Sequence, residues 1–151
     1  MDMDETLDNF VQKLQEQIFE EAKGFYGEIA FRRWQNPLYS GSMSDPDGFA
    51  RVKGKCGDTM EIYLKFGNSR VNEAVYQTDG CASSNVCGSF AAEMSIGKSP
   101  DEILEITGEK ILNKLGGFPK EQEHCAFLAA ETLQEALNDY MVKETKKRKQ
   151  K

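Results

Sequence analysis

The chain contains four cysteines, the residue type best suited here to metal or sulfur chemistry: Cys56, Cys81, Cys87 and Cys125. Cys56 is bracketed by glycines in GKCGD, and Cys81 directly follows a glycine in DGC. Glycine beside a cysteine leaves room for a metal ion or substrate near the backbone, and a cysteine that merely packs does not need it. The alternative at each position is a free cysteine packed as a small apolar side chain, which is a common role.

The position of two of these cysteines relative to predicted helices favours the reactive form. Cys81 lies just ahead of a predicted helix, and Cys125 lies in the first turn of the last one. A helix N-terminus carries a partial positive charge and unpaired N–H groups, which favour thiolate over thiol. Thiolate is the form that binds metal or attacks sulfur. We therefore predict a cluster of easily ionised sulfurs at Cys56, Cys81 and Cys125.

Asp58 and His124 stand beside these thiols. Asp58 adds a carboxylate two residues after Cys56, although aspartate in a turn is more often a turn former. His124 is the only histidine and adjoins Cys125; the alternative is an ordinary surface histidine. The spacing of the cysteines matches no compact zinc motif, which would show a paired C-x2-C. Any shared site must therefore be assembled by the fold.

The strands predicted from the sequence supply that assembly. DTMEIYLKF, residues 58–66, alternates apolar and polar side chains, as in a half-buried strand. GNS, 67–69, is a hairpin loop, residues 70–78 return as a second strand, and residues 50–55 supply a third. In an antiparallel pair, the start of one strand lies beside the end of the next. The hairpin should therefore bring Cys56 and Cys81 to one edge of the sheet.

Helices are predicted on either side of these strands. The segment 5–23 is amphipathic and capped by Asp4. Further helices are expected at 83–96, from Ser99 to about 106, from Thr107, and from about 121 to 142. Cys87 shares a core-facing stripe of its helix with Phe90, Ala91 and Met94, which predicts a packed thiol; the alternative is a secondary sulfur-parking or redox role. The predicted fold is α+β: a small three-stranded antiparallel sheet packed against four to five helices, with a long C-terminal helix.

Composition narrows the class of protein further. The length of 151 residues indicates one domain, assigned to residues 1–142. Residues 143–151 form a basic tail, predicted to be disordered, with a docking arm for an acidic partner as the alternative. A net charge of −6 argues against nucleic-acid binding, and no apolar run approaches the roughly 18 residues of a membrane span. The acidic start MDMDETLD resembles neither a secretory nor a transit signal, so we expect a cytoplasmic protein with reduced cysteines.

Four segments, in this order, carry a resemblance to a known family: GKCGDTMEIYLKF, TDGCASSNVC, GKSPDEI and HCAFLAAETLQEALNDY. Together they closely resemble the NifU/IscU family of iron–sulfur cluster assembly scaffolds. FRRWQNPLYSGSM is also similar to that family's N-terminal His/Tyr-x-x-Asn-Pro-x-x-x-Gly stretch. The resemblance extends over roughly residues 20–142.

The resemblance implies that Cys56, Cys81 and Cys125 receive sulfur and hold a nascent, transient [2Fe–2S] cluster. Asp58 matches the aspartate that makes the cluster labile and can itself ligate metal, and His124 matches an alternative ligand. The implied partners are a cysteine desulfurase, which delivers persulfide sulfur, and recipient apo iron–sulfur proteins. Iron and the cluster are then cargo, so no enzymatic turnover is expected. A set of ligands one thiolate short of the usual four cysteines suits a carrier that must release its cluster.

The chain also departs from the family. LGGFPKEQEHC stands where bacterial and mitochondrial IscU proteins have a Leu-Pro-Pro-Val-Lys segment read by a dedicated Hsp70, so such a partner is doubtful. The SufU-type insertion between Asp58 and the second cysteine is absent. We expect a stand-alone N-terminal module without a C-terminal ferredoxin-like or Nfu domain. Two alternatives remain open: a zinc-bound, SufU-type sulfur acceptor that activates a desulfurase, and a structural zinc module without a transfer role. In both, Zn²⁺ would occupy the same ligands.

Overall fold

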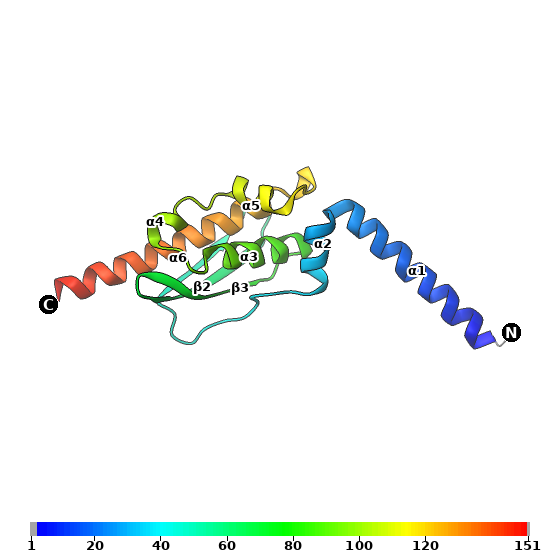
Figure 1. The fold of residues 1–151 in the computed structure, drawn as a ribbon, viewed down its shortest axis with the longest axis horizontal. Helices are drawn as coiled ribbons and strands as arrows, with labels where there is room; N and C mark the ends of the chain where they lie inside the picture. Colours follow the sequence, from blue (N-terminus) through cyan, green and yellow to red (C-terminus); the bar gives the residue numbers. More distant parts are fainter. Residues whose placement is uncertain (1–2, 151) are drawn as a thin grey trace.

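The computed structural model describes residues 3–150, and its centre is a three-stranded antiparallel sheet. The strands are β1 (Gly48–Lys53), β2 (Thr59–Gly67) and β3 (Arg70–Thr78), in the spatial order β1-β2-β3. The helices are α1 (Met3–Tyr26), α2 (Glu28–Gln35), α3 (Ala82–Ser95), α4 (Pro100–Ile103), α5 (Gly108–Leu115) and α6 (His124–Lys149), with a 3-10 turn η1 (Lys120–Gln122). The predicted α+β class, the three-stranded meander and the long C-terminal helix are confirmed (Figure 1).

The sheet forms because apolar and polar residues alternate along its strand β2. Met60, Ile62 and Leu64 of β2 are fully buried, whereas the residues between them stay partly exposed. The two-residue hairpin at Asn68 and Ser69 has positive φ at both positions. This is the turn geometry whose twist matches that of the flanking strands.

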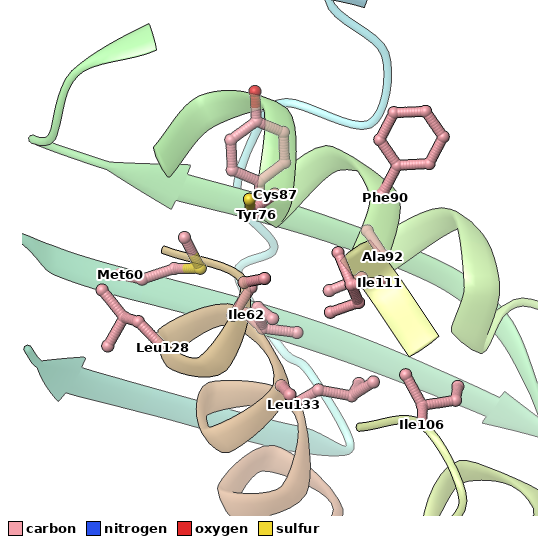
Figure 2. Packing of buried hydrophobic residues seen from close by; sticks show 14 of the residues in the cluster. Met60, Ile62, Tyr76, Cys87, Phe90, Ala92, Ile106, Ile111, Leu128 and Leu133 are labelled. Atoms are coloured by element: carbon pink, nitrogen blue, oxygen red, sulfur yellow. The ribbon is translucent and has the colours of Figure 1, made fainter. Parts of the chain in front are cut away.

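The buried face of the sheet is covered by two helices. α6 packs on β1 and β2, α3 packs on β3, and the two helices also pack against each other. Figure 2 shows the side chains between them, with Ile62 of the sheet near Leu133 of α6 and Ile111 of α5. This core fixes the positions at which α3 and α6 begin, and those two helix starts carry Cys81 and Cys125.

The short helices α4 and α5 each begin directly after a capping residue. Ser99 accepts a hydrogen bond from the backbone of Glu102, and the Glu102 side chain accepts one from the backbone of Ser99, so the predicted capping box is present. Thr107 caps α5 through the backbone N–H of Lys110, as predicted. α4 is shorter than predicted and ends at Ile103.

α2 was not predicted from the sequence. It is only eight residues long, and Gly27 before it has a φ of 87° and no capping side chain, so no start signal marks it. Tertiary contacts hold it instead: the Arg33 guanidinium lies 3.9 Å from the ring centre of Phe90 and donates hydrogen bonds to Ser89 and Glu93 of α3. The segment between α2 and β1 is a loop.

The two longest helices differ from their predicted bounds. α1 begins at Met3, so Asp4, predicted as its cap, lies inside the first turn. α6 continues through Lys149, past the predicted end at Val142, so the basic residues 143–149 are helical where disorder was expected. Lysine and arginine are good helix formers and interact favourably with the C-terminal end of the helix dipole. Within residues 3–150, none of the helices has the length and apolar character needed to cross a bilayer.

Candidate metal centre

The β1–β2 turn places Cys56 and Asp58. Gly54 donates a backbone hydrogen bond to the carbonyl of Asp58, Gly57 donates one to the carbonyl of Gly54, and Gly57 has a φ of 93°. Most residues with a side chain avoid this φ, so glycine is needed for the turn to form. Asp58 then leads directly into β2, while the Cys56 thiol is left exposed on the turn.

The pairing of β2 with β3 brings Cys81 to the same end of the sheet. Met60 lies opposite Thr78, so the residues just before β2 and just after β3 are neighbours. The side chain of Asp79 accepts a hydrogen bond from the backbone N–H of Thr59 at 2.7 Å and holds the two chain segments together. A Cβ atom on Gly80 would lie 2.6 Å from Asp58 Oδ2, so only glycine lets the segments approach this closely. The expected placement of Cys56 and Cys81 at one end of the sheet is observed.

Three of the predicted residues converge. One ligand atom from each of Asp58, Cys81 and Cys125 lies within 4.8 Å of the other two. These atoms come from the start of β2, the N-cap of α3 and the first turn of α6. Residues far apart in the sequence are therefore assembled by the fold, as the absence of a compact motif required. We call these three residues the Asp58 triad.

The other two predicted residues lie next to this triad, outside it. Cys56 and His124 line a neighbouring pocket of about 480 Å³, whose other lining residues are Gly54, Lys55, Phe127, Leu128 and Glu131. His124 Nε2 lies 3.6 Å from the sulfur of Cys125. Both side chains are thus adjacent to the triad, with Cys56 carried on an exposed turn.

The two triad thiols have opposite electrostatic environments. Partial burial acts to raise the pKa of Cys81, but the backbone N–H groups of Ser84 and Ser83 and the Ser83 hydroxyl outweigh it, so the pKa is lowered. Burial raises the pKa of Cys125 to about 11, helped by the negative charges of Cys81, Cys56 and Asp58 and opposed by the Ser84 hydroxyl. The prediction of an easily ionised thiol is confirmed at Cys81 and wrong at Cys125. A position in the first turn of a helix does not offset complete burial of the sulfur.

Ser84 is a residue of this centre that sequence reasoning missed. Its Oγ donates a hydrogen bond to Asp58 Oδ2 at 2.8 Å and lies 3.4 Å from the sulfur of Cys125. It therefore joins the carboxylate and the buried thiol before any metal arrives. Its position one turn into α3, three residues after Cys81, was the available signal, but serine is too common there to be informative.

Cys87 lies apart from the centre. It is fully buried in the core (Figure 2), and burial raises the pKa of its thiol well above the ordinary value. The predicted packed thiol is confirmed.

Residues 25–147 match the family model for the NifU-like N terminal domain. This chain therefore belongs to the NifU-like N-terminal domain family. It is 40% identical over 122 residues to the iron-sulfur cluster assembly scaffold protein IscU 1 of Archaeoglobus fulgidus, and the match covers 80% of each chain. It is 34% identical over 127 residues to the iron-sulfur cluster assembly enzyme IscU of Drosophila melanogaster, covering 81% of this chain and 82% of that protein.

Solved structures share the fold. A nitrogen-fixing NifU-like protein (N-terminal) from Brucella abortus superposes with a TM-score of 0.63 at 20% identity, over 81% of this chain and 98% of the other. A putative iron-sulfur cluster assembly scaffold protein for the SUF system from Fervidobacterium islandicum gives a TM-score of 0.63 at 20% identity, over 76% of this chain and 98% of the other.

Proposed function

We propose that this chain is a scaffold that assembles a transient [2Fe–2S] cluster and transfers it to apoproteins. The convergence of Asp58, Cys81 and Cys125 carries the proposal, because two sulfur ligands and one oxygen ligand meet where three separate elements begin. The names of the IscU relatives support the same cargo. The cluster is cargo that the protein passes on, so the proposal assigns no enzymatic turnover to this chain.

The chemistry of the ligands suits temporary binding. Clusters of this kind are usually held by four cysteines, and this centre offers two thiols and a carboxylate in the triad. Cys56 supplies the third thiolate once its exposed turn moves toward the triad, and His124 is the alternative donor. An incomplete set of thiolates holds iron less firmly than a ferredoxin site does, which favours release.

The same arrangement suggests how sulfur arrives. Cys56 lies on an exposed turn, beside a pocket with the apolar side chains of Phe127 and Leu128. We propose that a cysteine desulfurase delivers persulfide sulfur at this face. A thiolate of the centre attacks the outer sulfur of the desulfurase persulfide, and the desulfurase cysteine leaves as a thiolate. Reduction of two such sulfurs to sulfide takes four electrons, two from the oxidation of two ferrous ions and two from a thiol reductant such as free cysteine. Recipient apo iron–sulfur proteins then take the finished cluster.

Anaerobic reconstitution tests the proposal. The protein is incubated with ferrous iron, cysteine and a cysteine desulfurase, and cluster formation is followed by visible absorbance and circular dichroism. We expect alanine at Cys56, Cys81 or Cys125 to abolish stable loading. Wild-type loading in any of these three variants would contradict the assignment of that ligand.

Cys87→Ser is the matched control for these variants. It changes a cysteine of the same chain that is buried away from the centre, so it should load like the wild type. A hydroxyl in that apolar position should lower the free energy of unfolding by about 1–3 kcal/mol. Failure of the folded Cys87→Ser protein to load would place this residue in the centre and overturn the proposal as stated.

A zinc-bound, SufU-type sulfur acceptor is the second candidate. The spacing within the triad favours it, because four ligands around one Zn²⁺ ion at about 2.0–2.3 Å bring their donor atoms this close together. Metal analysis of the purified protein, followed by exposure to iron and sulfide, separates the candidates. Bound zinc that resists replacement would support the zinc site. Sulfur transfer from a desulfurase onto that zinc form would then distinguish a sulfur acceptor from a structural zinc module.

A further inference from the structure

α1 carries an apolar face that no other part of residues 3–150 covers. None of its residues is buried, and Leu7, Phe10, Val11, Leu14 and Ile18 are between 43% and 65% exposed. The helix extends away from the sheet and its covering helices in Figure 1. Residues 3–24 also precede the family match, which begins at residue 25, so the role of the shared domain does not account for this face.

The contacts of α1 with its own chain use other side chains. Phe19 packs edge-on against Phe31 of α2 with ring centres 6.0 Å apart, and Tyr26 lies against Phe118. Phe19 follows Ile18 directly, so it points about 100° away around the helix axis. The apolar face therefore remains free while α2 holds the C-terminal end of the helix.

The residue types along this face follow a heptad repeat. Leu7, Val11, Leu14 and Ile18 are spaced four, three and four residues apart, with leucine at the d positions and β-branched residues at the a positions. Such a combination favours a two-stranded coiled coil. A coiled coil also needs a partner helix with the same repeat, and a second copy of this chain provides one.

We propose that α1 pairs with α1 of a second copy and makes the protein a weak homodimer. The e and g positions beside the repeat are occupied by Asp8, Gln15, Phe10 and Gln17, which set no two like charges against each other. The other exposed end of the molecule fits this face poorly, because the basic end of α6 offers only Met141 and Val142 as exposed large apolar residues. α1 is itself acidic, with six carboxylates against two lysines, which disfavours an anionic lipid surface.

The area of the apolar face of α1 limits how tightly the two copies can bind each other. The face runs from Leu7 to Ile18, about 18 Å of helix and roughly 10 Å across, so each copy contributes a footprint on the order of 200 Å². Standard interfaces bury about 800 Å² of accessible surface on each partner. We therefore expect a reversible dimer that forms in the micromolar range rather than an obligate one.

Sedimentation velocity of the full chain over a micromolar concentration series tests the proposal. Reductant and a metal chelator exclude dimers made by disulfides or by shared metal. The wild type should show a monomer–dimer equilibrium, and Leu14→Glu should raise the dissociation constant at least about tenfold by placing a charge in the apolar seam. Gln12→Glu adds the same charge on the opposite, exposed face and is the matched control. Urea unfolding should be unchanged in both variants, because the side chains of Gln12 and Leu14 are both exposed.

The salt dependence of the dissociation constant identifies which surfaces form the dimer interface. Two acidic α1 helices repel each other, so added salt should strengthen this dimer. A contact between the acidic α1 of one copy and the basic end of α6 in another would weaken with salt and would overturn the proposal. A protein that stays monomeric throughout the series, or equal weakening by Gln12→Glu and Leu14→Glu, would overturn it as well.

Discussion

Complete burial of the Cys125 sulfur has a consequence for stability as well as for reactivity. The pKa of this thiol rises from 9.0 to about 11 because the folded protein removes it from water. Below pH 9 the thiol is protonated in both the folded and the unfolded chain, so the full stability is present. Between these two values only the unfolded chain ionises, and the free energy of unfolding should fall with rising pH, by on the order of 2 kcal/mol from this residue.

Urea unfolding at pH 7 and pH 11 measures this effect, with Cys125→Ala as the comparison. Cys87 is buried as well and has a raised pKa, so the wild type should lose stability through both thiols. The variant should lose less than the wild type over the same interval. An equal loss in the two proteins would show that Cys125 is not protected from ionisation by the fold.

Asp58 is the only oxygen donor in the triad, which suggests a role in cluster release. Oxygen is a weaker partner than thiolate for iron in these clusters. We expect Asp58→Ala to hold a reconstituted cluster severalfold longer and to transfer it more slowly to an apo-ferredoxin, because the alternative donor His124, beside Cys125, can then take the vacated position. Decay of the visible circular dichroism signal measures both rates. Faster loss in the variant would instead make Asp58 a required ligand.

At the scale of elements, the loop between α5 and η1 departs from the Hsp70-recognised segment for a backbone reason. Gly116 has a φ of 71° and Gly117 a φ of 139°, whereas proline holds φ near −65°. A Pro-Pro pair therefore cannot occupy this loop in its present shape.

We expect a peptide spanning residues 114–122 to stimulate the ATPase of a scaffold-reading Hsp70 weakly or not at all. The same peptide carrying Leu-Pro-Pro-Val-Lys is the positive control, since it restores the segment while leaving the length similar. Equal stimulation by the two peptides would show that the glycines do not prevent recognition.

At the scale of the whole molecule, stability is unevenly distributed. β2, α3 and α6 enclose the buried core, whereas α1 buries no residue and projects from one end (Figure 1). Regions with few buried contacts open with little free energy, so their backbone amides exchange quickly. In dilute protein, amides of α1 should exchange roughly a hundredfold or more faster than those of β2 and of residues 125–137 in α6.

Hydrogen exchange followed by mass spectrometry measures this difference. Repeating it at high concentration connects the prediction to the proposed dimer, because pairing should slow exchange in α1 alone. Protection of α1 equal to that of the core in dilute protein would mean that its apolar face is covered within its own chain.

Elements whose signals are local could be predicted from the order of the residues alone. Alternation at Met60, Ile62 and Leu64 predicted β2, and the Ser99 capping signal predicted the start of α4, because each depends on residues close together in the chain. Adjacent glycines drew attention to Cys56 and Cys81, and the sheet edge they share followed from hairpin pairing. Cys87 was predicted to be packed from the spacing of its apolar neighbours, and it is.

Which predicted ligands meet, and how easily each ionises, depends on the packing of distant segments. Cys125 joins Asp58 and Cys81 because the core sets α6 against α3, while Cys56 stays on its turn outside the triad. Burial then raises the pKa of Cys125, and Ser84 ties that thiol to Asp58. Desolvation and close approach depend on atoms brought together from distant parts of the chain, so no local pattern encodes them.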